Sequence, residues 1–398
     1  MIASIRKKYN QNFTEAKYQA MLSDIARLNN GELDFRIAET PIFINRSLKN
    51  KLIKAGDEIC SYITSPAFIK NTNRAFAQVA TPPNENELPN CIVMDFAICE
   101  NEVNELAPKL IELQGFPSLF GFEVFHNRAY QNEFNLPNGY SPYLNGYNEH
   151  SYIQFLNTII KGTDPTKKTI LLELFPQNQK TKIDFNCTSE LIDIPIVCLS
   201  DIIVKNNHLY YIKNGIEILV DRIYNRIVWD ELSKQPLAIQ DKAKLLLQSL
   251  HVQWITHPNH YYRISKFMMP FLNSEFVPKS KFLNEVELLP NNLENYVLKP
   301  LFSYAGQGVI IDLTPKDLTA ITDPENWILQ EKVIYAPAIE TPSGPAKTEI
   351  RLFYFWDAIS KKYKATLNLT RLSKGKMIGV AYNANATWVG GSLAYFEA

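Results

Sequence analysis

The segment 295–311 constrains the fold more than any other part of the sequence. It reads NYVLKPLFSYAGQGVII, a pattern that predicts a strand, a glycine turn and a second strand. Taken alone it favours a plain β-hairpin, because glycine supplies the positive φ of a hairpin tip without steric cost. Lys299, however, lies inside the apolar first strand, where an unpaired ammonium group is costly unless an anion meets it. The tip also carries small residues that would let backbone amides approach an anion: Ser303, Ala305, Gly306 and Gly308.

Length and composition exclude several classes of protein. A chain of 398 residues is too long for one compact core, so we expect two or three packed domains. Its 41 basic and 41 acidic residues balance, which argues against a nucleic-acid partner. No apolar run approaches the roughly 20 residues needed to cross a bilayer, and the polar N-terminus has no secretory apolar region. Five cysteines without a CxxC pair predict buried, reduced thiols in a cytoplasmic protein.

The hydrophobic pattern predicts mixed helices and strands without an internal repeat. Residues 169–221 alternate β-like runs with polar connectors, as in an α/β layer. The Pro/Asn-rich stretch 81–90 predicts a linker. The polar stretch 135–151 predicts a long loop, either a substrate lid or a solvated connector. Helices are expected at 13–30, 242–252, 259–272 and 315–322, and strands at 91–98 and from about 280 onward.

A second strand, WILQEKVI (327–334), follows the hairpin and carries polar residues inside an apolar run. A lysine strand, a small-residue hairpin and a polar-interrupted strand together resemble the ATP-grasp fold, in which two α+β lobes close on ATP. The resemblance implies that Lys266 and Lys299 contact ATP and that Glu331 and the backbone near Val333 face the adenine. It implies a wider nucleotide set that also includes Ser303, Gly306, Gln307, Gly308, Gln330 and Lys332.

Two further strands resemble the arginine strands of that fold. TEIRLFYF (348–355) carries Arg351, and NLTRLSKG (368–375) carries Arg371. The resemblance implies that both side chains act as catalytic groups on the transferring phosphoryl group. Arginine suits this role because its planar fork donates two parallel hydrogen bonds to phosphate or carboxylate oxygens.

The carboxylates that would hold magnesium are absent from their usual place, because no Asp or Glu lies between Asp357 and Glu397. Upstream, VMDFAI carries Asp95 and KLIELQGF carries Glu112 and Gln114. Residues i and i+2 of a strand share a face, so Glu112 and Gln114 can reach one ion together. Magnesium takes one or two carboxylates together with phosphate oxygens and water. The metal site is therefore expected at Asp95, Glu112 and Gln114.

This order resembles the circularly permuted ATP-grasp arrangement of glutathionylspermidine synthetase-like proteins, in which the metal-binding hairpin precedes the ATP lobe. NATWVGGS (385–392) is similar to that group, as is the 208–228 run that places Arg222 and Arg226. The resemblance covers roughly residues 90–398. Two positions depart from it: Gln114 stands where the family usually has asparagine, and Val93 where it often has arginine. No thiol-amidase domain is present.

Plainer interpretations stay open for several of these residues. Asp95 and Glu112 are alternatively edge-strand carboxylates facing water, and Arg351 and Arg371 alternatively structural ion-pair partners. Lys266 is alternatively a solvated helix residue, because the apolar stripe around it leaves it off the core face. His251, His257 and His260 have no matching acidic or cysteine ligand, so no metal is expected there. A helix is expected to begin at 257–260, with Asn259 as its N-cap.

The expected fold is therefore α+β, a circularly permuted ATP-grasp with a preceding α/β layer and an N-terminal helical segment. The expected divisions are 1–90, helical or irregular; 91–134, metal-binding strands; 135–258, the α/β layer; 259–340, the small ATP lobe; and 341–398, the arginine strands. The expected activity is an ATP- and magnesium-dependent ligase that joins a small-molecule carboxylate to an amine through an acyl phosphate. A nucleotide-binding sensor without ligation and a kinase acting on a small hydroxyl compound are the alternatives.

Overall fold

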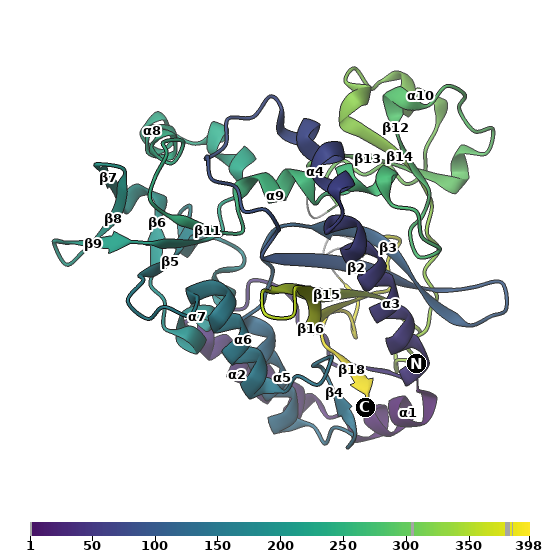
Figure 1. Ribbon diagram of the computed structural model, residues 1–398. Helices are drawn as coiled ribbons and strands as arrows, with labels where there is room; N and C mark the ends of the chain where they lie inside the picture. Colours follow the sequence, from purple (N-terminus) through teal and green to yellow (C-terminus); the bar gives the residue numbers. More distant parts are fainter. Residues whose placement is uncertain (1, 304–305, 379–382, 384) are drawn as a thin grey trace.

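The computed structural model describes residues 2–303, 306–378, 383 and 385–398. Within these residues the fold is mixed α+β, with five sheets and helices packed around them (Figure 1). None of the helices in these ranges is long and apolar enough to cross a membrane.

The central element is an antiparallel sheet in the order β17-β16-β15-β2-β3. Successive side chains of its strands point to opposite faces of the sheet, and both faces are buried. One face, with Ile92, Met94 and Phe96, packs in the same core as α3, which lies across β2 and β3 in Figure 1. On the other face, Val93 and Phe353 pack in a second core with residues of α5. The bounds are β2 Cys91–Glu100, β3 Leu106–Gln114, β15 Lys347–Asp357, β16 Lys362–Ser373, β17 Gly390–Ser392, α3 Arg46–Ile63 and α5 Phe122–Glu133.

A parallel sheet forms the predicted α/β layer, in the order β11-β10-β5-β6. Its strand β5 is buried throughout, as expected for a parallel strand covered on both faces. A small antiparallel sheet, β7-β8-β9, extends from it at the left of Figure 1. The bounds are β5 Thr169–Glu173, β6 Ile196–Cys198, β7 Ile202–Lys205, β8 His208–Lys213, β9 Ile216–Val220, β10 Arg222–Asn225, β11 Gln253–Ile255, α6 Glu149–Lys161, α7 Lys182–Ile192 and α8 Leu237–Leu245.

A third sheet, β12-β14-β13, contains the lysine strand. The predicted hairpin is present only as a single bridge, in which the backbone of Leu298 exchanges two hydrogen bonds with that of Ile310; the strand partner of β13 is β14. Gly306 and Gly308 both have φ of 74°, as the turn was expected to require. The bounds are β12 Ser280–Phe282, β13 Tyr296–Pro300, β14 Trp327–Glu331 and α10 Pro315–Thr319.

The two ends of the chain meet in a fourth sheet, β1-β18-β4, in which β18 is the central strand. Strand β1 (Ile42–Ile44) runs parallel to β18 (Ala394–Glu397), and β4 (Tyr140–Ser141) pairs with it antiparallel. Figure 1 shows both termini on this side of the molecule. The remaining helices are α1 Ala3–Asn12, α2 Glu15–Ala26, α4 Pro66–Thr72 and α9 Pro258–Arg263.

Two local expectations need correction. The helix expected near 257–260 does begin there, but its N-cap is His257, whose side chain accepts the backbone N–H of Asn259; Asn259 itself lies inside α9. The stretch 135–151 is not loop throughout: it contains the short strand β4, Tyr143 and Leu144 are buried, and the Leu144 N–H donates to the Thr366 carbonyl, although most of its residues are exposed or half-buried.

Candidate functional site

A polar cluster interrupts the apolar face of the central sheet where β2 and β15 pair. Asp95 and Arg351 are direct cross-strand partners, which places both side chains on one face. The Arg351 guanidinium donates to both carboxylate oxygens of Asp95, at 2.5 and 2.6 Å. Arg371 donates to the same carboxylate at 2.7 Å. Asp95 is only 2 % exposed, so the interpretation of this acid as a water-facing edge residue is wrong.

Glu349 completes this cluster from β15. It lies two residues before Arg351, hence on the same face, and is the cross-strand partner of Arg371, with which it forms an ion pair. Its other oxygen accepts the Tyr335 hydroxyl at 2.9 Å. Burial opposes ionisation of Asp95, but Arg351 and Arg371 outweigh it and hold its pKa below the usual value. Burial raises the pKa of Glu349, with the neighbouring Asp95 charge adding to the rise and Arg371 opposing it.

A β-bulge at Ile111 brings the third acid to this face. Asp95 pairs with Glu112 and Phe96 pairs with Leu110, so Ile111 has no partner on β2. The Ile111 carbonyl accepts a hydrogen bond from Lys299 Nζ at 3.0 Å. Lys299 therefore reaches from β13 onto the edge strand of the central sheet. Burial lowers its pKa to about 8, although Glu112 acts in the opposite direction.

Lys266 meets Glu112 at the same place. Its ammonium nitrogen lies 2.9 Å from Glu112 Oε1 and also donates to the backbone carbonyl of Ser303, in the loop after β13. The Lys266 side chain is 4 % exposed, so the alternative of a solvated helix residue is wrong. The structure thus brings together seven of the predicted residues: Asp95, Glu112, Lys266, Lys299, Ser303, Arg351 and Arg371.

The other predicted nucleotide residues surround this cluster without joining its contacts. Gly306, Gln307 and Gly308 are exposed at the hairpin tip, and Ala305 lies outside the described residues. On β14, Gln330 is 1 % exposed and its Nε2 has no partner among the described residues. The Glu331 carboxylate accepts the backbone N–H of Lys279 at 3.1 Å. Lys332 pairs with Asp312, and Val333 follows it at intermediate burial.

The residues predicted for magnesium fit that ion only in part. Both oxygens of Asp95 are taken by guanidinium groups, and a cation placed there would face two positive charges. Glu112 uses only Oε1 in its ion pair, and Gln114 lies on the same face two residues later. Within the described ranges, no three His, Cys, Asp or Glu side chains are grouped to hold a metal. Magnesium at this site stays a prediction, carried by Glu112 and Gln114 rather than by Asp95.

The sequence interpretation missed two members of the site. Glu349 stands two residues before Arg351, so strand alternation alone would have placed it beside the arginine. Ser118 follows β3 and accepts a hydrogen bond from Arg351 Nη1 at 3.0 Å, while its backbone carbonyl accepts from Arg226 at 2.8 Å. No sequence signal singles out Ser118, because its contacts arise from three separate segments.

No protein-family model matches the sequence, and no curated protein matches it. Among solved structures, the chain is similar to the apo form of a glutathione synthetase-like effector (GSS30) from Globodera pallida. The match has a TM-score of 0.56 at 11% identity and covers 100% of this chain and 99% of that chain. The two chains therefore share a fold over their whole length. At this identity the likeness concerns the fold alone, and the chemistry has to be argued from the cluster itself.

Proposed function

We propose that the protein binds ATP against the polar face of the central sheet and joins a carboxylate to an amine. The observation that carries this proposal is the charge of the cluster. Four basic side chains (Lys266, Lys299, Arg351 and Arg371) meet three acidic ones (Asp95, Glu112 and Glu349) in a largely buried setting. A buried positive excess is costly without an anion. A nucleotide phosphate supplies that anion.

The position of Arg371 supports the same proposal. Its Nη2 serves both Asp95 and Glu349, while its buried Nε has no partner among the described residues. The side chain as a whole is 32 % exposed, so part of the guanidinium faces open space. An arginine held by two acids, with its Nε unpartnered within the described residues, is preorganised to receive a phosphoryl or carboxylate oxygen.

We propose that these groups act by alignment and charge neutralisation. A substrate carboxylate oxygen attacks the γ-phosphorus, the bond to the bridging oxygen breaks, and ADP leaves with that electron pair. Lys266 and Lys299 neutralise the phosphates, and Arg371 stabilises the transferring group. The amine then attacks the acyl carbonyl, inorganic phosphate leaves, and the amine loses a proton. Magnesium, held by Glu112 and Gln114, would withdraw charge from the phosphate oxygens when bound.

We also propose that the fold is a circularly permuted ATP-grasp, with the divisions expected from the sequence. Strands β2 and β3 precede the lysine hairpin in the chain, yet they share one sheet with β15 and β16, which follow it. This order is the one that the resemblance to glutathionylspermidine synthetase-like proteins implies. The likeness to a glutathione synthetase-like effector is consistent with it.

A second candidate function, ATP binding without ligation, is favoured by one observation. The carboxylate of Asp95 is fully engaged by Arg351 and Arg371. An acid used in this way stiffens the sheet and leaves fewer oxygens for a metal. A protein built so would still attract a nucleotide and would serve as a sensor or a partner.

Incubation with ATP, magnesium and a pool of amino acids, polyamines and small carboxylates separates these candidates. A ligase releases ADP only when both a carboxylate and an amine are present, and mass spectrometry then detects the amide. ATP binding in calorimetry without ADP release would support the second candidate. ADP release without an amine would indicate a kinase. Absence of ATP binding would contradict all three.

A further inference from the structure

The predicted linker 81–90 is tied to helix α9 by one side chain. Glu85 Oε1 accepts from Arg263 Nε at 2.5 Å, and its Oε2 accepts from Arg263 Nη2 at 2.9 Å and from Asn259 at 2.7 Å. His260 Nε2 lies 3.5 Å from Oε1. The arginine side chain is 5 % exposed and that of Glu85 19 %. The pair is therefore a mostly buried, bidentate ion pair, with Asn259 as a further donor to Oε2 and the His260 ring close to Oε1.

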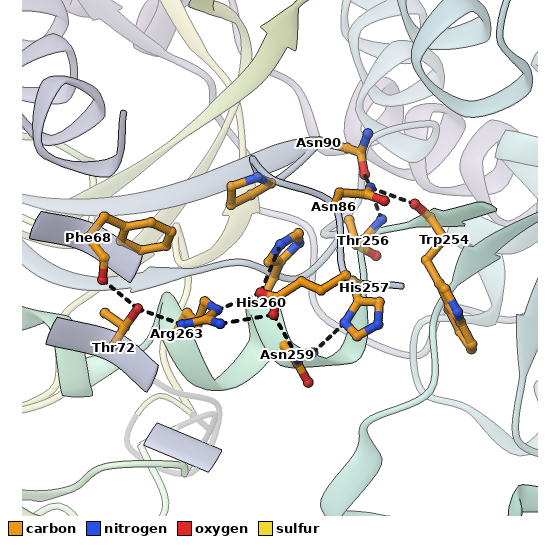
Figure 2. A network of polar contacts seen from close by, with 12 residues as sticks. Phe68, Thr72, Asn86, Asn90, Trp254, Thr256, His257, Asn259, His260 and Arg263 are labelled. Atoms are coloured by element: carbon orange, nitrogen blue, oxygen red, sulfur yellow. Dashed lines mark hydrogen bonds and ion pairs between the residues drawn. The ribbon is translucent and has the colours of Figure 1, made fainter. Parts of the chain in front are cut away.

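The same arginine fixes α9 to the helical segment before the linker. Its Nη1 donates to Thr72 at 3.1 Å and to Asn73 at 2.8 Å, and its guanidinium lies 4.7 Å from the centre of the Phe76 ring. Figure 2 shows Arg263, His260, Asn259 and Thr72 in this network of polar contacts. The N-terminal region therefore holds one side of α9.

Other parts of α9 contact the end of β3, next to the candidate site. The Gly115 N–H donates to the Ile264 carbonyl at 2.8 Å, directly after the end of β3. A Cβ at Gly115 would lie 2.2 Å from the His260 carbonyl oxygen, so the two backbones are in direct contact. Tyr261 donates its hydroxyl to the Phe302 carbonyl at 3.0 Å, beside Ser303.

Only two residues separate Arg263 from Lys266, and both are fixed. Ile264 N–H donates to the His260 carbonyl at 3.0 Å, and the Ser265 hydroxyl donates to the Tyr262 carbonyl at 2.8 Å. A shift of α9 is therefore transmitted to the Lys266 ammonium, which bridges Glu112 and Ser303.

We infer that Glu85 is a positioning residue for the phosphate site: by holding Arg263 and α9, it keeps Lys266 between Glu112 and the loop at Ser303. This inference rests on the proposed function for its consequence, since Lys266 is taken to meet the nucleotide phosphates. It gives the first 90 residues, which no motif explains, a role in nucleotide binding without contact to the nucleotide.

The substitution Glu85→Gln tests this with little change of shape. Both oxygens of Glu85 face donors, so an amide NH₂ in either orientation points a donor at Arg263. We expect the Kd for ATP to rise about tenfold or more, while the weaker binding of adenosine, which lacks phosphates, stays unchanged. Glu85→Asp, which retains the charge, should restore much of the ATP affinity. Glu105→Gln, at an exposed ion pair with Lys51, is the matched control.

A second readout does not depend on ATP. Reductive methylation followed by mass spectrometry measures the reactivity of Lys266, which is protected by its burial and its ion pair. Glu85→Gln should increase the labelling of Lys266 and leave the buried Lys299 protected, whereas unfolding would expose both. If Glu85→Gln does not fold, Arg263→Lys replaces it, because lysine keeps the charge but loses the fork.

The outcomes separate the two proposals. If the wild-type protein does not bind ATP, the proposed function fails, but selective labelling of Lys266 in the variant still supports the role of Glu85. If Lys266 labelling and the ratio of ATP to adenosine affinity are both the same as in the wild-type protein, the inference is wrong. Equal loss of ATP and adenosine affinity, with labelling of both lysines, would also overturn it.

Discussion

The buried charge of Lys299 lowers the stability of the fold, and the same charge is the one proposed to bind phosphate. The residue is 8 % exposed, and its ammonium group donates a hydrogen bond to the Ile111 carbonyl. Burial lowers its pKa to about 8. The depressed pKa means that the folded state disfavours the charged form. At neutral pH the protein therefore holds a charge at a cost, which a bound phosphate would offset.

Replacing Lys299 by methionine should therefore stabilise the fold while weakening ATP binding. Removing the buried charge stabilises the folded state by about 3 kcal/mol, whereas loss of the hydrogen bond destabilises it by about 1 kcal/mol. We therefore expect the free energy of unfolding at pH 7 to rise by about 1–2 kcal/mol. Denaturant unfolding measures the gain, and calorimetry measures the loss of ATP affinity. Lys316→Met, at an exposed lysine of α10, should change neither. A destabilised Lys299→Met variant would contradict this account.

The pH dependence follows from the same shift. The folded pKa of Lys299 is about 8 and lies below the ordinary 10.5, so between these values the unfolded chain binds more protons. The contribution of Lys299 thus makes the wild-type protein more stable as pH rises through that window, and Lys299→Met should lack this rise. ATP affinity should fall above pH 8 in the wild-type protein, because the ammonium loses its proton. Unfolding and binding measured from pH 7 to 10 check both trends.

At the scale of elements, α9 is where the N-terminal region, the end of β3 and the loop after β13 meet. Its contact with β3 depends on glycine, because Gly115 brings its backbone against the His260 carbonyl. Any side chain there would push α9 away from the sheet edge that carries Glu112 and Gln114.

The substitution Gly115→Ala should separate these elements. Its Cβ would lie 2.2 Å from a backbone oxygen, which cannot rotate aside as a flexible side chain can. We expect destabilisation of about 3 kcal/mol or more, measured by denaturant unfolding, together with weaker ATP binding. Gly391→Ala is the matched control, because its Cβ would meet nothing closer than 3.7 Å. Equal stability of the two variants would contradict the close packing of α9.

The elements also show how far sequence reasoning reaches. The lysine strand and the glycine turn of 295–311 were predictable because their signals are local, and β2 was predictable from its nearly continuous apolar run. The ion pairs of Asp95 were not, because each joins strands more than 250 positions apart in the chain. Glu349 was predictable from Arg351 by strand alternation, but no motif marks it as part of the site. Sequence left Lys266 open between an ATP contact and a solvated helix residue, because its partners Glu112 and Ser303 are distant in sequence.

At the scale of the whole molecule, strand β18 at residues 394–397 pairs with strand β1 at residues 42–44 in one sheet. Strand β18 lies between β1 and β4, and its Tyr395 and Phe396 are buried. Asn368, buried in β16, donates to the Ala394 carbonyl at 2.9 Å and accepts the Ala394 N–H at 2.8 Å. The C-terminal strand is thus a structural part of both the terminal sheet and the edge of the central one.

Deleting residues 394–398 should therefore abolish cooperative folding. Each buried aromatic side chain removed costs about 3–5 kcal/mol, a large part of the roughly 5–15 kcal/mol by which domains are stable. Thermal unfolding followed by circular dichroism would show loss of the transition. Deleting Ala398 alone removes only exposed contacts with Arg46 and one backbone hydrogen bond, and should lower the Tm slightly. A sharp transition in the longer deletion would contradict this role for β18.

Because β1 pairs with β18, the first strand is synthesised long before its partner strand exists. Ile42, Phe43 and Ile44 meet partners that lie about 350 positions later in the sequence. At roughly 5–20 residues per second, a ribosome needs about 20 to 70 s to reach them. For that time the first strand has exposed hydrogen-bonding edges and apolar side chains, which is the state that chaperones bind. The sheet can close only once residues 394–396 have left the ribosome.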